Sequence, residues 1–540
     1  MWAQPFFDFE VKSRVRLFKR FSLALVVFFA STSSLTATAA EIYNPSKLVT
    51  APDQFIFTVG YSNPFMHSTL SLQPPAVEEI GVRGDWLYCY STEDPTCDFA
   101  NAKWGPDSRG ILGMSVLPYC ESDGAENCIE NFEISYDGES FSGAKHLRML
   151  ESGLTQVADP KLNYLGGASA SLWDDSTVKN SKNQSYLTNV VYSVFYSPDT
   201  KKFQVSNIAF GVIPYREEVG NYTAPKINKD APPNSRMDWG GTRDTTWSEN
   251  GKAGFAMEFP KDARYRLTVR LTNEVTGWYK ARLKDPQVGI SKFSNTNNRV
   301  IVEGQPVSVP TFAYSKLKGN FTPRENKWWQ NNGQVNNTTP AGADQSDIFE
   351  YLDYFRPLVS DKAAGFNTLW TVNSTNWGNE NKCLQDSSRV VGIVSTNAMG
   401  FNGNSPSYKD GTLNYQVAGM HYMPDGKSLV EGTYDLLIRS DAARCLYGFS
   451  NAPIQASISV TGEADQKVAT TAMTEGNGWI KLSAYGFTFS DPTISVKLSQ
   501  AKVQANTLVK KNKTITCIKG KISKKVSGIS PKCPAGYKKR

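Results

Sequence analysis

Four tryptophans stand among polar residues, where an indole can do more than fill a core. Trp328 and Trp329 are adjacent in an Asn/Gln-rich segment, and Trp239 and Trp377 also have polar neighbours. An exposed indole is a flat apolar surface that stacks on a sugar ring, while nearby Asn, Gln and Asp can bond the sugar hydroxyls. Tryptophan is more often buried, so the alternative is that these rings complete a core. Trp239, Trp328, Trp329 and Trp377 are therefore the candidate glycan contacts.

The carboxyl end carries a second kind of chemistry. Residues 510–540 contain eleven Lys/Arg and no Asp/Glu, which gives a charge of +11, and residues 1–40 carry +3. Because the total is +7, residues 41–509 carry −7. A nucleic-acid-binding protein usually spreads its positive charge over a folded domain, so we expect no nucleic-acid partner. Clustered cations attract polyanions, here an envelope polymer or a polysaccharide, although a solvated charge run without a partner is the alternative. The candidate polyanion contacts are Lys519, Lys521, Lys524, Lys525, Lys538, Lys539 and Arg540.

Eight cysteines predict disulfides rather than a metal site. The count is even, no CxxC occurs and the three histidines are scattered, so we expect no metal ion and no cofactor. Clustering along the chain favours four pairs, although the first two pairs could also exchange partners. The favoured pairs are Cys89–Cys97, Cys120–Cys128, Cys383–Cys445 and Cys517–Cys533.

Signatures of common enzymes are missing from the sequence. GxSxG, HExxH and GxxxxGK[ST] do not occur. Adjacent acids such as Glu217 and Glu218 would point to opposite faces of a strand, whereas a glycosidase needs two carboxyls that face each other across a cleft. We therefore assign no catalytic residue. An extracellular polysaccharide-degrading enzyme, similar to a glycoside hydrolase, remains the alternative, because its two acids can be distant in sequence.

The amino-terminal residues 1–40 predict a secretory signal peptide. Basic residues from Lys12 to Arg20 precede ten apolar residues, Phe21 to Ala30, and a small-residue cleavage pattern ends at Ala39. A membrane span needs about 20 apolar residues. We therefore expect a protein that is secreted and associated with the cell surface or cell wall, with no transmembrane span in the mature chain.

Short runs of β-branched and aromatic residues between turn formers predict the elements that must position these side chains. We expect an all-β fold, mainly β-sandwich domains with one or two short helices, followed by a small disulfide-closed basic module at the C-terminus. In residues 265–271, apolar and polar residues alternate as in a strand that packs on one side. Helical spacing at Ile348, Tyr351, Leu352 and Phe355 predicts a helix, and residues 143–154 are a further helix candidate.

Changes in composition divide the chain into segments. The predicted segments are a signal peptide (1–40), an N-terminal β-rich domain (41–225), a linker or long loop (226–245), a middle β domain (246–315), a polar loop with a short helix (316–364), a C-terminal β-sandwich domain (365–500) and a basic Cys-containing tail (501–540).

The tail, TCIKGKISKKVSGISPKCPAGYKKR at 516–540, resembles a C-terminal module with the form TCxKGK…KKV…PKCPxGYKK. That module recurs on uncharacterised secreted cell-surface proteins of actinobacteria. Residues 276–290 (TGWYKARLKDPQVGI) and 381–462 also resemble parts of these proteins. The resemblance implies export and surface residence, and no reaction. We therefore expect a structural, adhesive or glycan-contacting role, with the basic tail serving envelope attachment or sorting.

Overall fold

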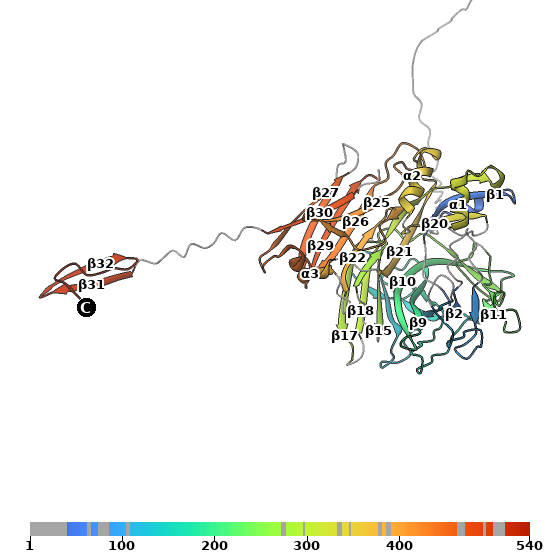
Figure 1. The fold of residues 1–540 in the computed structure, drawn as a ribbon, viewed down its shortest axis with the longest axis horizontal. Helices are drawn as coiled ribbons and strands as arrows, with labels where there is room; N and C mark the ends of the chain where they lie inside the picture. The colour runs from blue at the N-terminus through green and yellow to red at the C-terminus, as the bar shows by residue number, and fades with distance from the viewer. Residues whose placement is uncertain are drawn as a thin grey trace, which may run out of the picture. The chain divides into compact units, whose positions relative to one another are not determined.

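The computed structural model describes most of the chain after the predicted signal peptide (Figure 1). The described residues are 40–61, 66–73, 86–103, 109–242, 244–271, 277–294, 298–331, 337–344, 347–375, 381–384, 390–461, 470–489, 493–500 and 513–540. Among them, no helix has both the length and the apolar character needed to cross a membrane.

Strands dominate the described residues, which confirms the all-β prediction. The largest set forms one hydrogen-bonded network that closes on itself. Its first strands are β2 (Thr69–Leu72), β3 (Leu87–Cys89), β4 (Ile111–Val116), β5 (Cys128–Ser135), β6 (Ser142–Gly143), β7 (Lys145–Met149), β8 (Ser171–Asp174), β9 (Ser185–Ser197) and β10 (Lys202–Val219). It continues with β13 (Trp247–Glu249), β14 (Lys252–Ala256), β15 (Arg264–Leu271), β16 (Gly277–Ala281), β17 (Leu283–Lys292), β18 (Asn298–Thr311), β21 (Gly365–Thr375), β22 (Val390–Thr396), β26 (Gly432–Arg439), β28 (Thr470–Gly476) and β29 (Trp479–Phe487).

Smaller sheets complete the strand inventory of the described residues. A three-stranded sheet contains β19 (Tyr314–Leu317), β1 (Gln54–Gly60) and β20 (Thr338–Gly342), and a two-stranded one contains β11 (Lys226–Ile227) and β12 (Met237–Asp238). A further sheet has the order β23 (Gly400–Phe401), β25 (Thr412–Ala418), β30 (Thr493–Gln500) and β27 (Ile454–Thr461), with β24 (Ser407–Lys409) on β25. The C-terminal sheet contains β32 (Ile522–Gly528), β31 (Lys513–Lys519) and β33 (Lys538–Lys539).

Helices are few and short. They are α1 (Pro323–Asn331), α2 (Ile348–Leu358) and α3 (Ser440–Tyr447), with 3-10 turns η1 (Pro45–Leu48), η2 (Lys318–Asn320) and η3 (Lys382–Leu384). The spaced apolar residues of α2 are all buried, which confirms the helix predicted there. The helix predicted within 143–154 is wrong, because Lys145–Met149 forms β7 and pairs with β8.

β15 has the alternation that its sequence predicts. Tyr265, Leu267 and Val269 are fully buried in the main core. The opposite face is covered by charge pairs rather than open to water: Arg266 contacts Glu303, and Arg270 contacts Glu130. The two partner acids lie on the neighbouring strands β18 and β5.

Several strand pairs join segments that the sequence analysis assigned to different domains. β1 is antiparallel to β19 and parallel to β20. β10 pairs with β21, and β16 pairs with both β21 and β22. Composition along the chain marks where strands and turns occur, but it does not say which strands exchange hydrogen bonds.

Candidate functional site

β2, β3 and β4 lie side by side and present different side chains on their two faces. Ser71 of β2 lies opposite Tyr88 of β3 and Leu112 of β4. Side chains alternate between the faces of a strand, so these three share one face. Leu70 and Cys89 point the other way and are buried in the main core. The sheet therefore has one face packed on the core and one that bears a hydroxyl and an aromatic ring.

A groove lies over the second face, and we call it the aromatic groove. Its volume is about 250 Å³. Trp239, from the segment after β12, is 47% exposed and stands edge-on to Tyr88 with ring centroids 6.1 Å apart. The groove is lined by Thr69, Ser71, Trp86, Tyr88, Leu112, Met114 and Trp239.

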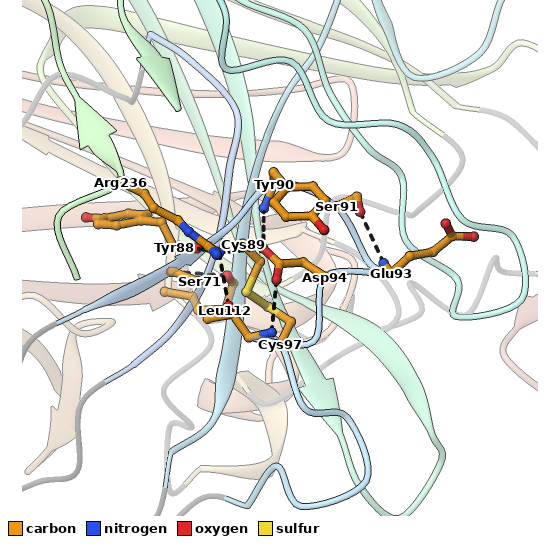
Figure 2. Close-up of a disulfide and its surroundings, with 11 residues drawn as sticks. Ser71, Tyr88, Cys89, Tyr90, Ser91, Glu93, Asp94, Cys97, Leu112 and Arg236 are labelled. Atoms are coloured by element: carbon orange, nitrogen blue, oxygen red, sulfur yellow. Dashed lines mark hydrogen bonds and ion pairs between the residues drawn. A yellow bond between two sulfur atoms is a disulfide. The ribbon is translucent and has the colours of Figure 1, made fainter. Parts of the chain in front are cut away.

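Arg236, three residues before Trp239, contacts the loop closed by the Cys89–Cys97 disulfide (Figure 2). Asp94 is buried in this loop and accepts from the backbone N–H of Tyr90 at 3.0 Å and of Thr96 at 2.9 Å. Arg236 reaches the loop from the segment between β11 and β12. Its Nη1 donates to Asp94 Oδ2 at 2.8 Å and to the Tyr88 carbonyl oxygen at 3.2 Å. The predicted linker 226–245 is thus bonded to the residues next to the groove.

Backbone geometry fixes the turn directly after Trp239. Gly240 has a φ of +63°, a conformation that side chains rarely adopt. A Cβ atom at this position would come within 2.3 Å of the Thr223 carbonyl oxygen. The Gly240 N–H donates to Asp238 Oδ1 at 3.0 Å. Only glycine therefore fits there without a shift of the backbone at Thr223.

The chemistry of the aromatic groove is stacking and hydrogen bonding. Among the described residues, its lining holds no carboxylate, imidazole or thiol. Burial raises the pKa of Tyr88, so its phenol stays neutral at physiological pH. Two indoles, a phenol and two hydroxyl residues together suit an uncharged ligand with both apolar faces and hydroxyl groups.

The predicted tryptophans have different environments. Trp239 lies in the groove, whereas Trp328 is only 3% exposed and packs against Tyr351 and Phe355. Trp329 is half-buried, with Lys318 Nζ 3.8 Å from its ring centroid. Trp377 lies outside the described residues. Of the candidate glycan contacts, Trp239 alone has the open indole surface that stacking requires among those described.

Trp86 and Tyr88 were missed by the sequence analysis. They occur in DWLYCYS, a run that indicates a strand and gives no reason to expect an open face. The available signal is their spacing, since residues at i and i+2 lie on the same face of a strand. That spacing does not show which face meets the core.

The four disulfides are those favoured by cysteine clustering. They join Cys89–Cys97, Cys120–Cys128, Cys383–Cys445 and Cys517–Cys533. The first two pairs do not exchange partners. Disulfides of this kind form and persist in oxidising compartments, so their presence indicates an extracellular environment.

Residues 513–540 form a small disulfide-closed sheet, which we call the basic module. Cys517 is fully buried, and it lies opposite Lys524 of β32 and Lys539 of β33. Lys525 and Lys538 lie opposite the neighbouring residues of β31 and therefore point to the other face. Both faces of the module carry exposed cations. The exposed candidates are Lys519, Lys521, Lys524, Lys525, Lys538, Lys539 and Arg540.

Within the described ranges, no group of three or more His, Cys, Asp or Glu side chains is placed to hold a metal ion. No protein-family model matches the chain, and no match is found among curated proteins. The features of the molecule that indicate a function are therefore the geometry of the aromatic groove and the charge of the basic module.

Proposed function

We propose that the protein is a secreted bacterial cell-surface protein that binds glycan through the aromatic groove, and that its basic module attaches it to an anionic polymer of the envelope. The observation that carries the proposal is the half-exposed Trp239 standing beside Tyr88 and Trp86 over a face that bears Thr69 and Ser71.

The neutral lining of the groove defines the class of glycan. A sugar ring has apolar C–H faces, which suit the indoles and the phenol, and hydroxyl edges, which suit Thr69 and Ser71. A strongly charged sugar would leave its charge without a partner in this groove, which is unfavourable. The volume of about 250 Å³ is near the lower end of ligand pockets, about 300 Å³. The ligand is therefore a short, uncharged stretch of polysaccharide.

The basic module supports the attachment half of the proposal. A two-stranded hairpin alone is marginally stable, whereas closing a loop of this size by a disulfide offsets about 3 kcal/mol of chain entropy. The lysines are therefore presented on a defined frame. Attraction between exposed cations and a polyanion is weakened by salt, so the attachment is reversible by ionic strength.

Binding to polysaccharides tests the groove. The full exported chain is incubated with cellulose, chitin and purified cell-wall polysaccharide, and the unbound protein is measured. Trp239→Ala should weaken binding about tenfold, equivalent to about 1.4 kcal/mol. Val219→Ala, at a position 83% exposed on β10, serves as the matched control and should bind as the wild type does. Equal binding by Trp239→Ala, or no retention by any polysaccharide, would overturn the proposal. Release of reducing ends would instead support the hydrolase alternative.

Cell fractionation tests the attachment. A variant with Lys519, Lys521, Lys524 and Lys525 changed to Glu should appear in the culture medium, whereas the same four changed to Arg should stay on the cell. Concentrated NaCl should elute the wild type. If the Glu variant stays on the cell as the wild type does, the basic module is not the attachment element.

A further inference from the structure

A second pocket lies where β1, β16, β21 and β23 approach one another. Its volume is about 130 Å³, and Tyr61, Lys280, Arg282, Asp344 and Phe401 are among the residues that line it. It shares no lining residue with the aromatic groove. We call it the Arg282 pocket.

Arg282 is a buried cation with an unused donor. The residue is 5% exposed, and its Nη1 donates to the carbonyl oxygens of Thr396, at 2.9 Å, and Ala398. Its Nη2 is also buried, and within the described part of the chain it has no hydrogen-bond partner. A buried N–H donor without an acceptor is unfavourable.

Two aromatic rings fix the guanidinium. Its Cζ lies 4.5 Å from the ring centroid of Phe401 and 5.5 Å from that of Tyr61. These contacts favour the charged form of Arg282, but an aromatic ring carries no net charge and does not neutralise the guanidinium. Among the described residues, no carboxylate pairs with this positive charge.

The neighbouring charges cancel each other. Lys280 Nζ contacts Asp344 Oδ2, so this pair contributes no net charge to the pocket. Arg282 leaves a single uncompensated positive charge among the lining residues described. A monoanion would balance it.

Burial, the main cause, lowers the pKa of Arg282 to about 10, which still leaves the guanidinium charged at neutral pH. Burial, followed by repulsion from Arg282, also lowers the pKa of Lys280. Both cations are thus largely shielded from water, which strengthens their attraction to an anion.

We propose that the Arg282 pocket binds the carboxylate group of a small monoanion, with Arg282 Nη2 as its principal donor. Lys280 is already paired with Asp344, so Arg282 supplies one positive charge for a ligand. This matches the single negative charge of a carboxylate. A phosphate dianion would bring a second negative charge close to Asp344. The carboxylate belongs either to a free small acid or to an acidic sugar, since both present the same group.

Titration of the full exported chain with acetate, glucuronate, methyl glucoside and inorganic phosphate tests the proposal, with binding followed by ligand-detected NMR and calorimetry. Acetate or glucuronate should bind saturably, and methyl glucoside and phosphate should not. Binding of acetate identifies a free small acid as sufficient, whereas binding of glucuronate alone identifies an acidic sugar.

Two substitutions that change the charge of the pocket give the sharper test, because they should change the affinity for a carboxylate in opposite directions. Asp344→Asn raises the net charge of the pocket and should tighten carboxylate binding about tenfold, whereas Lys280→Gln lowers it and should weaken binding about tenfold. Lys179→Gln is the control, since that exposed lysine pairs with Asp137 away from the pocket and should change nothing. No saturable carboxylate binding by the wild type, equal binding of phosphate, or an unchanged affinity in Asp344→Asn would overturn the proposal. These outcomes are independent of the polysaccharide test of the aromatic groove.

Discussion

Arg236 and Asp94 determine where Trp239 stands. The Asp94 side chain is 1% exposed and that of Arg236 is 12% exposed, so their ion pair is largely shielded from water. Arg236 also donates to the Thr96 hydroxyl at 3.0 Å and to the Ala231 carbonyl oxygen at 3.0 Å. One side chain thus ties the β11–β12 segment to the Cys89–Cys97 loop.

Arg236→Ala should lower the free energy of unfolding by about 3 kcal/mol, because it leaves a buried carboxylate without its cation. Hydrogen exchange should accelerate in residues 226–242. Arg216→Ala is the control, since Arg216 is 43% exposed in its ion pairs and should cost less than about 1 kcal/mol. Equal effects of the two substitutions in denaturant unfolding would show that Arg236 does not hold the segment.

Asp435 is a second residue whose environment has a measurable consequence. It is fully buried and accepts from the hydroxyls of Ser483 and Tyr485, at 2.5 Å and 2.8 Å, and from the Asp285 N–H. Burial raises the pKa of Asp435 to about 6, and the two hydroxyl donors reduce this effect. The difference from the ordinary value of 3.8 corresponds to about 3 kcal/mol.

The sign of the pH effect follows from this raised pKa. The folded protein binds the proton more tightly than the unfolded chain. Ionisation of Asp435 therefore lowers the free energy of unfolding, by its full amount above pH 6 and by progressively less as pH falls towards 3.8. Asp435→Asn removes this dependence. The stability of the wild type relative to Asp435→Asn should therefore rise by up to about 3 kcal/mol between pH 7.5 and pH 4. A difference that is constant across this range in urea unfolding would contradict the assignment.

The start of α1 is specified by the side chains at its amino-terminal end. The Glu325 N–H donates to the Thr322 hydroxyl at 3.2 Å, and the Thr322 N–H donates to Glu325 Oε2 at 2.7 Å, which is a capping box. Lys316 pairs with Glu325 at 2.8 Å. Burial tends to raise the pKa of Glu325, but these partners lower it overall. The helix buries Trp328 as a result.

Thr322→Ala should destabilise the protein by about 1 kcal/mol through loss of the cap. Glu325→Ala should cost more, about 2 kcal/mol, because it also removes the partner of Lys316. The two effects should not add, since the residues share one capping box, and a coupling energy of at least about 0.5 kcal/mol is expected from the double variant. Strict additivity in thermal or urea unfolding would mean that the capping box does not act as a unit.

The accuracy of the sequence predictions differs between elements for physical reasons. β15 and α2 were predicted because a single buried face imposes a period on the sequence. α1 was missed, although Thr322-Pro323-Arg324-Glu325 has the pattern of a helix start, because its polar composition favoured a loop. Residues 145–149 were misassigned because apolar residues at 147, 149 and 150 suit a helix and a strand equally.

The arrangement of the whole molecule was the least predictable level. The aromatic groove combines residues from 69–71, 86–88, 112–114 and 239, and the sequence pattern indicates only Trp239. Its partners come from strand pairs that form across long stretches of chain, and neither alternation nor composition encodes those pairs. The three disulfides whose partners are 8 or 16 residues apart were the exception, because closeness along the chain limits the distance between the two cysteines.

The most direct test of glycan binding is an NMR experiment on the indole N–H signals of the full exported chain. The signals are assigned with Trp86→Phe, Trp239→Phe and Trp328→Phe variants, and the polysaccharide retained best is added as soluble oligosaccharides. The signals of Trp86 and Trp239 should shift in a saturable manner, and that of the buried Trp328 should not. If saturation leaves the Trp86 and Trp239 signals unchanged, the aromatic groove is not the glycan site.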